Sequence, residues 1–392
     1  MTEKIFLRVC MLIDAWEPFI GGGQIHAKKL SEYLIKCQNV EIDIFTRALK
    51  NDLGEKIKNN EIDLDKKRRV FRLGKAGNVL SFVSRILWCF SVYWRVKKEH
   101  KKKPYDLIHA HAFVGGIPGK FLSKILKIPI IFTVHGTTLT LVLKKKGLFY
   151  FIEKFLLTKI AYTKVISVAS NYLQLKNVNK NVEIIPNGVE TEKFDEVNVK
   201  KSENNFRVLF VGRFDKVKGL NVLMEAISVL FENNKNLLNE KNFKLVIIGY
   251  GDEEKPLKNL VDNFKLGELI EFKGKIIGEE LIKEYKKSDI FILPSLSEGN
   301  PLTLFESFAA KVPVLATDVG DNKKYIKENV NGFICDPNDV KSLVLTLTKA
   351  LNCEKLKVMG ENGYNMVKNN FSWEKTANLT YNVYLKTLNI KS

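Results

Sequence analysis

Short apolar runs alternate with longer amphipathic patterns along most of this chain. The runs hold about four to eight residues and are rich in β-branched side chains, which is typical of buried strands. Between them, apolar residues recur at spacings of three and four, which predicts helices. Strands that alternate with helices predict βαβ units and parallel sheets. The predicted strands are residues 6–13, 40–46, 107–111, 129–134, 164–169, 182–185, 206–211, 244–248, 270–272, 290–293, 314–316 and 332–335.

A turn signal divides these strands into two sets of six. The sequence PNGV at residues 186–189 is followed by a polar stretch that reaches Asn205. A chain of 392 residues is also too long for one compact core. We therefore predict an α/β protein with two doubly wound, Rossmann-like domains, residues 1–188 and 189–372, that face each other across a cleft. Ligands of such sheets bind at the carboxyl ends of the strands.

Two carboxylates flank a predicted helix start after the strand 290–293. Glu298 lies in a polar turn, Pro301 suits the first turn of a helix, and Glu306 lies one turn further on. The backbone N–H groups of residues 299–302 lack helical partners and can donate to hydroxyl or phosphate oxygens. Thr303 and Glu306 have the spacing of a capping box, but Thr303 would already lie inside the helix. We therefore favour a ligand site over a purely structural helix cap.

Two basic residues follow the strand 206–211. Arg213 and Lys218 flank a turn at the carboxyl end of this strand. Arginine offers a fork of donors to phosphate oxygens and lysine offers a point charge. Fixed cations stabilise charge that develops on a leaving group. The alternative is a pair of solvated surface cations.

Glycines and histidines follow strands in the first half. Gly21, Gly22 and Gly23 precede a helix predicted to start near Gln24; we expect them to accept positive φ and to let the backbone approach a ligand closely. His135 ends the strand 129–134. His111 ends the strand 107–111, and we place it on the opposite side of that strand from His109, so that the two could not form a metal site together.

The run SEGNPLTLFESFAAKVPVLATDVG, which carries Glu298 and Glu306, resembles the E-x7-E signature of the retaining glycosyltransferases of family 4, which have the GT-B fold. FTVHGTT around His135, and the spacing of Arg213 and Lys218, resemble further motifs of that family. The resemblance implies catalytic roles for His135, Glu298, Arg213 and Lys218, and an acceptor-side position for His111. It implies that the donor is bound by Gly22, Gly23, Arg213, Lys218, Lys275, Ile276, Glu298, Gly299, Asn300, Pro301, Leu302 and Glu306.

The resemblance also implies a mechanism. A sugar would leave a nucleotide diphosphate, UDP- or GDP-linked, and the departing phosphate would take the acceptor's proton on the same face. No divalent metal or other cofactor would be required. The final helix from residue 373 would pack back onto the first domain. Near Gly320 the family usually shows a second glycine and a glutamate, where this chain has Asp321 and Lys324, so the shape of that loop is open.

Charge is unevenly distributed. Residues 1–190 hold 33 Lys+Arg against 16 Asp+Glu, a balance of +17, whereas the remainder holds 30 against 28, or +2. A basic first half favours an anionic surface or substrate there. We expect a glycan or lipid-linked acceptor and peripheral contact with an anionic membrane. Five scattered cysteines and no apolar run long enough to span a bilayer favour a cytoplasmic protein, at the inner face of the cell membrane.

Two segments of the first half remain to be placed. Residues 81–100 carry a broad apolar stripe that ends in lysines; it fits a core helix or one lying on a membrane, and we favour the core. The stripe contains Phe82, Ile86, Leu87, Phe90, Tyr93, Trp94 and Val96. Residues 47–75 are polar and lysine-rich and are predicted as a loop, whose Asp63-Leu64-Asp65 we reject as a D-x-D metal motif because no hydrophobic strand accompanies it.

Two other function classes stay open. One is a GT-B enzyme that is not a transferase, such as a nucleotide-sugar epimerase, which would form product without an acceptor. The other is a nucleic-acid-binding protein, which only the net charge of +19 favours. The chain lacks a basic face with interleaved aromatic residues and any recognised nucleic-acid module, so we expect no nucleic-acid partner.

Overall fold

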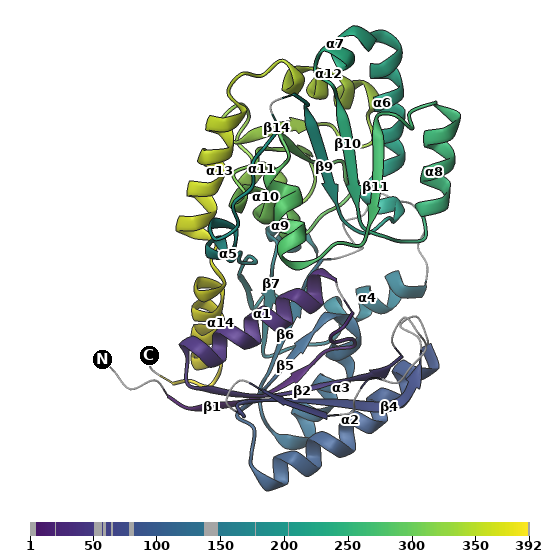
Figure 1. Ribbon diagram of the computed structural model, residues 1–392. Coiled ribbons are helices and arrows are strands. Elements are labelled where there is room, and N and C mark those ends of the chain that lie inside the picture. Colours follow the sequence, from purple (N-terminus) through teal and green to yellow (C-terminus); the bar gives the residue numbers. More distant parts are fainter. Residues whose placement is uncertain are drawn as a thin grey trace. The chain divides into compact units, whose positions relative to one another are not determined.

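The computed structural model describes residues 5–19, 21–50, 57, 60–63, 66–77, 82–136, 148–176, 178–202 and 204–390. The chain forms two compact units (Figure 1). Unit 1 holds Met1–Asn187 and Trp373–Ser392, and unit 2 holds Gly188–Ser372. Each is an α/β unit built on a largely parallel sheet.

Unit 1 contains an eight-stranded sheet in the order β3-β4-β2-β1-β5-β6-β7-β8. All neighbouring pairs are parallel except β3 and β4. Strand order reverses between β1 and β5, as in a doubly wound fold. The strands are β1 (Leu7–Leu12), β2 (Val40–Leu49), β3 (Asn60–Asp63), β4 (Arg68–Gly77), β5 (Leu107–His111), β6 (Ile130–Val134), β7 (Lys164–Ser167) and β8 (Val182–Ile184). The helices are α1 (Gly22–Cys37), α2 (Phe82–Lys102), α3 (Ala112–Leu126), α4 (Leu148–Thr158) and α14 (Trp373–Thr387).

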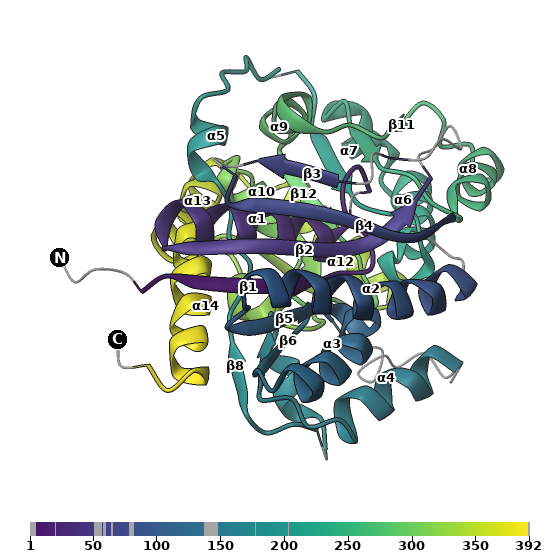
Figure 2. The same cartoon turned by 90° about the horizontal axis from the view of Figure 1, so that it is seen from below.

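Successive residues of the unit 1 strands point to opposite faces, and each face is covered by its own helices. Val9 and Met11 of β1 pack with Leu30 of α1 and Tyr384 of α14. On the other face, strand residues pack with α2, α3 and α4 through side chains such as Trp88. Figure 2 shows α2 and α3 on the same side of the strands. The C-terminal helix α14 thus completes the core of unit 1.

The prediction of a polar loop over residues 47–75 is wrong. β2 extends into this stretch, and β3 and β4 occupy much of its remainder. Arg68 of β4 lies 2.6 Å from Asp63, and Arg69 lies 2.5 Å from the buried Asp43. Ion pairing lets charged side chains occupy positions near a sheet core. A strand built in this way lacks the apolar alternation by which strands are found in sequence. Leu64 and Asp65 of the rejected metal motif lie outside the described residues.

Unit 2 contains a six-stranded, all-parallel sheet in the order β11-β10-β9-β12-β13-β14. This is the doubly wound order, with its switch point between β9 and β12. The strands are β9 (Arg207–Val211), β10 (Lys244–Ile248), β11 (Ile270–Gly274), β12 (Ile290–Leu293), β13 (Val314–Thr317) and β14 (Gly332–Cys335). The helices are α5 (Thr191–Asp195), α6 (Leu220–Asn233), α7 (Lys235–Glu240), α8 (Glu254–Asn263), α9 (Gly278–Lys286), α10 (Leu302–Ala309), α11 (Asn322–Tyr325), α12 (Val340–Leu351) and α13 (Leu356–Asn370).

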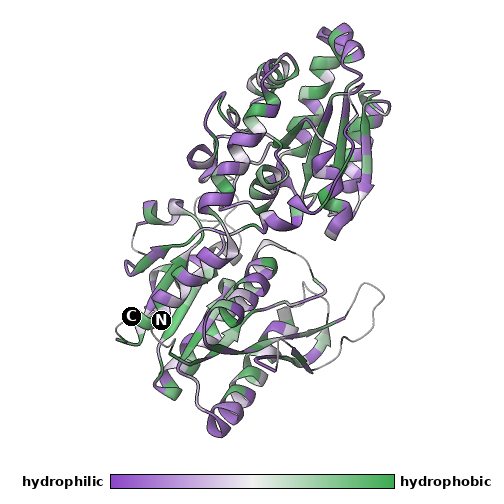
Figure 3. Cartoon of the chain, turned by 60° about the vertical axis from the view of Figure 1, so that its left-hand side comes forward, coloured by the Kyte–Doolittle hydropathy of each residue, from purple (hydrophilic) through white to green (hydrophobic). Residues whose placement is uncertain are grey.

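Both faces of the unit 2 sheet are buried. Phe210 and Ile292 face a cluster that includes α6, α8 and α12, whereas Leu209 and Phe291 face α9, α10 and α13. Burial on both faces explains the nearly continuous apolar character of these strands. The hydropathy colouring of Figure 3 shows the apolar strands between helices whose outer faces are mostly polar. The loops at the carboxyl edge of the sheet are left to carry polar side chains.

Candidate active site

The two loops at the switch point of unit 2 are packed together. One follows β9 and contains Gly219, whose φ of +66° lies in the left-handed region. A Cβ atom at Gly219 would lie 2.1 Å from the carbonyl oxygen of Pro294, in the loop after β12, so no other residue fits. The N–H of Leu296 donates to the carbonyl of Val217 at 2.7 Å. These contacts place the residues that follow β9 beside those that follow β12.

This packing brings Lys218 and Glu298 into an ion pair. Lys218 Nζ lies 2.6 Å from Glu298 Oε1, and their side chains are 22% and 8% exposed. Ser295 Oγ donates to the same carboxylate oxygen at 2.6 Å. The pair is therefore mostly removed from water. In this environment a charge interacts more strongly with its neighbours than it would on the open surface. The sequence places both residues at strand ends but does not show their contact, or the part taken by Ser295.

Arg213 has a different environment. Its side chain is 68% exposed, and its Nη2 atom lies 3.0 Å from Asp215 Oδ2. An exposed pair of this kind contributes little to stability, so Arg213 is available to an anion. The structure therefore joins Lys218 with Glu298 and leaves Arg213 on the surface at the end of β9.

The start of α10 is ordered by its neighbours. Pro301 is the residue before the helix, which begins at Leu302, one position later than a first-turn proline would suggest. The Nδ2 of buried Asn300 donates to the Tyr325 hydroxyl at 2.9 Å. At Gly320, where φ is +57°, a Cβ would lie 2.2 Å from the carbonyl oxygen of Glu298. The loop after β13 thus supports Glu298 although its sequence departs from the pattern that the resemblance implies.

Glu306 has a partner that the sequence does not reveal. The Tyr285 hydroxyl of α9 donates to Glu306 Oε2 at 2.9 Å. Burial raises the pKa of Glu306, and the Tyr285 hydrogen bond opposes that rise. A carboxylate with one oxygen on Tyr285 retains lone pairs for a ligand's hydroxyl groups. Tyr285 lies inside a helix with no motif around it, so no sequence signal marks it.

Lys275 and Ile276 follow β11. Lys275 Nζ lies 5.4 Å from the ring centroid of Tyr250, in the loop after β10, and Ile276 packs against the core cluster that includes the buried residues of α10. Gly249 donates its N–H to the carbonyl of Gly274 at 2.8 Å, which joins the two loops. Lys275 and Ile276 therefore lie at the carboxyl edge of the sheet, on the far side of β9 from Glu298.

Four of the five histidines lie together in unit 1 at the ends of β5 and β6. His111 Nδ1 lies 3.2 Å from His135 Nε2, and the His26 ring lies 4.7 Å from that of His135. His109 contacts the Tyr384 hydroxyl and Thr133 Oγ1, each at 2.6 Å. Burial is the main cause that lowers their pKa values, to about 4 for His26, to about 3 for His109 and well below 6.5 for His111 and His135. All four side chains are therefore neutral near pH 7.

The expectation that His109 and His111 face opposite sides of the strand is wrong. Their ring centroids lie 4.2 Å apart. Residues two apart in a strand point to the same face, and only adjacent residues alternate. Among the residues that the structure describes, no group of three or more His, Cys, Asp or Glu side chains is arranged to hold a metal ion.

The glycine segment after β1 has a different conformation from the expected turn. α1 begins at Gly22, and Gly21 before it is extended with a φ of −164°, so none of these glycines needs a positive φ. A Cβ at Gly23 would lie 3.3 Å from His135 Cδ2, whereas a Cβ at Gly22 would meet nothing within 4 Å. Glycine therefore lets the N-terminus of α1 approach His135, where the first N–H groups of the helix lack intrahelical acceptors.

His26 is a site residue that the sequence analysis missed. It is buried in α1, and its Nδ1 atom lies 2.7 Å from Asn187 Oδ1. Its ring also meets that of Trp373 at 5.7 Å. Asn187 is the last residue of unit 1 before the chain enters unit 2, and Trp373 is the first after its return. His26 lies four residues after Gly22 in α1, and this spacing would have indicated that both residues lie on the same face of the helix.

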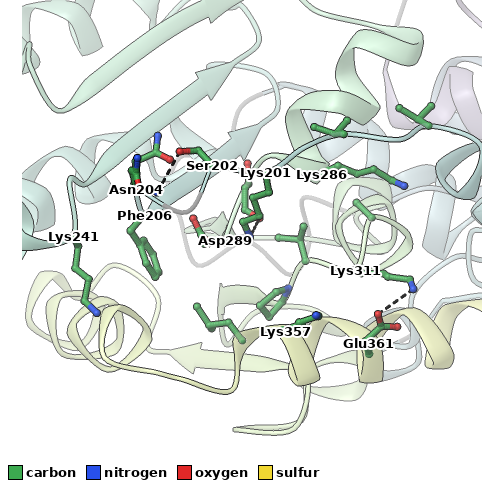
Figure 4. A pocket seen from close by; sticks show the side chains of 18 of the residues that line it. Lys201, Ser202, Asn204, Phe206, Lys241, Lys286, Asp289, Lys311, Lys357 and Glu361 are labelled. Carbon is green, nitrogen blue, oxygen red and sulfur yellow. Dashed lines mark hydrogen bonds and ion pairs between the residues drawn. The ribbon is translucent and has the colours of Figure 1, made fainter.

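A cavity of about 1070 Å³ lies elsewhere in unit 2, at the amino ends of the strands (Figure 4). Lysines line it, but several are paired: Lys201 lies 2.8 Å from Asp289, and Lys311 lies 3.0 Å from Glu361. Ligands of doubly wound sheets bind at the opposite, carboxyl edge. We therefore assign the candidate site to the loops around Lys218 and Glu298.

Comparison with known proteins gives consistent matches over nearly the whole chain. Residues 191–366 match the family model described as glycosyl transferases group 1, and residues 20–193 match the model of glycosyltransferase family 4. An uncharacterized glycosyltransferase of Methanocaldococcus jannaschii, MJ1178, is 32% identical, over 97% of this chain and 98% of its own.

Two further proteins show the range of the similarity. The Escherichia coli UDP-Gal:alpha-D-GlcNAc-diphosphoundecaprenol alpha-1,3-galactosyltransferase is 26% identical over 82% of this chain and 85% of its own. Among solved structures, sucrose-phosphate synthase from Thermosynechococcus elongatus has a TM-score of 0.82 at 22% identity, covering 97% of this chain and 98% of that one. The structural similarity supports the two-domain α/β fold.

Proposed function

Because this chain belongs to the group 1 glycosyltransferases of family 4, we propose that it transfers a sugar from a nucleotide-diphosphate donor with retention at the anomeric carbon. It is a transferase with the GT-B fold. The observation that carries the proposal is the Lys218–Glu298 pair at the switch point of unit 2. A doubly wound sheet binds its ligand at this position.

Lys218 is proposed to hold the donor diphosphate. An ammonium group has three N–H donors, so Lys218 can keep one on Glu298 and turn the others to phosphate oxygens. Negative charge grows on the diphosphate as the glycosidic bond breaks, and a fixed cation stabilises it. The N-terminus of α10 and the exposed Arg213 would add to this effect. The departing phosphate oxygen would accept the acceptor's proton, so no divalent metal or other cofactor is proposed.

The remaining residues receive roles around this centre. Glu298 and the backbone of residues 299–302 would hold the donor sugar, and Glu306, oriented by Tyr285, would accept hydrogen bonds from the ribose hydroxyls. The backbone of Lys275 and Ile276 would meet the base. In unit 1, His135 would contact donor sugar and acceptor, with Gly22 and Gly23 at the start of α1 near the diphosphate and His111 behind His135.

The acceptor is proposed to be a lipid-linked or cell-surface glycan precursor, met at the inner face of the cell membrane. The excess of +17 charges in residues 1–190 supports an anionic acceptor or surface. One of the relatives, the Escherichia coli galactosyltransferase, is named for a diphosphoundecaprenol acceptor and a UDP-sugar donor. No helix among the described residues is both long and apolar enough to cross a membrane. The contact with the membrane is proposed to be peripheral.

A thermal-shift panel of UDP-, GDP- and ADP-sugars tests the donor site. A ligand that binds only the folded protein raises its melting temperature, and we expect one base to do so. The best donor is then incubated with chelator and with acceptor extracts, and the anomeric configuration of the product is read by NMR. An inverted product, or activity that disappears with chelator, would contradict the proposed mechanism. Product formed without acceptor would instead support an epimerase.

A further inference from the structure

Helices α2 and α3 of unit 1 expose a continuous set of large apolar side chains. On α2 the exposed positions recur at spacings of four, three and four, which makes one stripe along the helix. Phe90 and Trp94 are each 67% exposed, and Phe121 of α3 is 59% exposed. Tyr93 joins the two helices, since its ring lies 5.0 Å from that of Trp94 and 5.8 Å from that of Phe121. We call Val83, Leu87, Phe90, Trp94, Ile117 and Phe121 the apolar ridge.

The ridge is additional to the core of unit 1. α2 buries a different face, with Trp88, Val92 and Val96 fully covered. The core role expected for the predicted stripe holds for Val96, which is buried, but is wrong for Phe90 and Trp94, whose side chains face outward. The outer face of a helix in a soluble domain is normally polar, and a contiguous exposed apolar surface marks an interaction site.

Charge around the ridge indicates the kind of partner. α2, α3 and α4 together contain nine Lys+Arg and two Glu, and both glutamates, Glu99 and Glu153, are 2% exposed. Within the described part of the chain, no carboxylate lies within ion-pair distance of Lys97, Lys98 or Lys101. These helices therefore present apolar and cationic groups with no accessible carboxylate of their own. The complementary partner is an extended anionic surface with an apolar layer beneath it.

We propose that the apolar ridge inserts into the interface of an anionic lipid bilayer, with the neighbouring lysines among the headgroups. Aromatic and aliphatic side chains gain free energy by leaving water at this depth, and lysines keep their charged ends at the surface. Each lysine near an anionic membrane adds to the attraction. The inference rests on the proposed membrane acceptor, and it assigns the surface that brings the enzyme to that acceptor.

Tryptophan fluorescence tests this position directly. The chain has four tryptophans, and Trp16, Trp88 and Trp373 are buried at 2%, 0% and 3% exposure, so Trp94 is the one in contact with solvent. Vesicles of phosphatidylcholine with phosphatidylglycerol should shift the emission to the blue, and brominated lipids should quench it. Trp94→Phe should abolish both responses while it retains binding. Emission that stays unchanged with vesicles bound would overturn the proposal.

Vesicle co-sedimentation of the full chain measures the binding energy. The double variant Phe90→Gln/Trp94→Gln should bind anionic vesicles at least roughly tenfold more weakly, since two large apolar groups lose their site. The matched control Leu345→Gln/Val358→Gln, at positions 62% and 60% exposed in unit 2, should bind like wild type. Lys97→Glu/Lys101→Glu should lose the preference for anionic over neutral vesicles.

The activity assay separates this proposal from the proposed function. Turnover on a water-soluble acceptor should be the same in the ridge variant and in wild type, whereas turnover on a vesicle-borne acceptor should fall with binding. The membrane assignment would be overturned if wild type did not bind anionic vesicles, or if the ridge variant bound them as tightly as wild type. If wild type did not bind them, a protein would remain as the partner of the ridge. If wild type showed no transfer to either acceptor, the transferase proposal would be refuted instead.

His111 ends β5 and lies beside His135. Its Nδ1 atom lies 3.2 Å from His135 Nε2, and its Nε2 atom is buried without a hydrogen-bond partner in the described structure. If His111 carried its proton on Nε2, a buried N–H would have no acceptor, which is rare. A proton on Nδ1 avoids this cost and is donated to His135 Nε2. His135 must then carry its own proton on Nδ1.

We infer that His111 is a positioning residue that fixes the tautomer of His135. With Nε2 occupied, neutral His135 presents an Nδ1–H donor to whatever it contacts, which under the proposed function is the donor sugar or the acceptor. A hydrogen bond to one ring nitrogen determines what the other can do. This role differs from the direct acceptor contact expected for His111 from the sequence.

Two variants of similar size test this role. Asparagine at 111 can place an amide N–H near the position of Nδ1, whereas leucine has no donor. Nitrogen-15 NMR should show His135 protonated on Nδ1 in wild type and in His111→Asn, and a mixture of tautomers in His111→Leu. Turnover should fall roughly tenfold in His111→Leu at an unchanged KM for the donor, and His111→Asn should restore most of it.

The NMR spectrum reports the tautomer of His135 independently of the activity assay. The inference is overturned if folded His111→Leu keeps the wild-type tautomer of His135. It is also overturned if His111→Asn resembles His111→Leu in both the NMR spectrum and the turnover. If the tautomers change as expected while turnover is unaffected, His135 has no part in the reaction, which contradicts the role given to it under the proposed function.

Discussion

The sheets of both units reverse their strand order at a switch point, but the two units place opposite kinds of side chain at their carboxyl edges. Unit 2 sets charged groups there, with Lys218 and Glu298 in a mostly buried pair and Arg213 exposed. Unit 1 sets neutral histidines there, packed ring to ring and kept unprotonated by burial. A charged edge can stabilise a leaving diphosphate, and a neutral edge can offer oriented hydrogen bonds to hydroxyl groups. Under the proposed function, the cations of unit 2 stabilise the leaving diphosphate and the histidines of unit 1 offer hydrogen bonds to hydroxyl groups.

Removing the negative charge of Glu298 should have a large effect on turnover. Glu298→Gln keeps an acceptor for Ser295 and leaves Lys218 without a competing carboxylate. We expect turnover to fall roughly a hundredfold while the nucleoside diphosphate of the best donor binds at least as tightly as to wild type. Steady-state kinetics and calorimetry check this. Glu328→Gln, which removes one partner of an exposed pair with Lys349, serves as the control. Weaker binding of this nucleoside diphosphate to Glu298→Gln would contradict the account.

The backbone at Gly219, which positions the Lys218–Glu298 pair, should be nearly as sensitive to substitution. Gly219→Ala places a Cβ against the Pro294 carbonyl at a positive φ, which we expect to lower the unfolding free energy by about 3 kcal/mol. Gly267→Ala, where the new Cβ meets nothing within 4 Å, is the matched control. Denaturant unfolding measures both variants, and equal stabilities would show that the loop after β9 tolerates the side chain.

Stability should depend on pH through the neutral edge of unit 1. The folded pKa of His26 is about 4 and that of His109 about 3, both below the unfolded value near 6.5. Below pH 6.5 the unfolded state therefore binds more protons, and stability is lost as pH falls toward the folded values. We expect a loss of about 2 kcal/mol per histidine between roughly pH 7 and 5. Unfolding of wild type and His109→Gln across this range checks it; identical slopes would argue against a buried neutral His109.

The smallest effect is expected at the proposed ribose contact. Tyr285→Phe removes the hydroxyl that donates to Glu306 and leaves the ring in the core. Loss of one hydrogen bond to a carboxylate is worth about 1–2 kcal/mol, so KM for the donor should rise roughly five- to thirtyfold with kcat little changed. Tyr364→Phe, which removes a hydroxyl that donates to Asp195 and leaves Glu306 untouched, is the comparison. A fall in kcat alone would place Tyr285 nearer to the reacting bond.

The comparison also explains what the sequence could predict. In unit 2 the strands are apolar on both faces and the polar residues gather at their ends, so fold and candidate residues were both accessible from pattern. Contacts across the sheet were not, because Tyr285 and Ser295 reach the two glutamates from segments without a motif.

In unit 1 the pattern was less informative. β4 escaped prediction because paired arginines interrupt its apolar residues. The apolar stripe of α2 misled because only part of it faces the core, whereas Phe90 and Trp94 face outward. His109 and His111 were placed on opposite faces by a wrong reading of strand periodicity. His26 was missed because its spacing from Gly22 gives only its side of α1, and its contact with His135 arises from tertiary packing.

The most direct test of the donor site is the turnover of Lys218→Ala with the best donor from the thermal-shift panel. Lys216→Ala, two residues away with a side chain 80% exposed, is the matched control. We predict that Lys218→Ala lowers turnover by roughly two to three orders of magnitude and keeps the wild-type fold, and that Lys216→Ala is near wild type. Unchanged turnover in folded Lys218→Ala would contradict the claim that this cation holds the departing diphosphate.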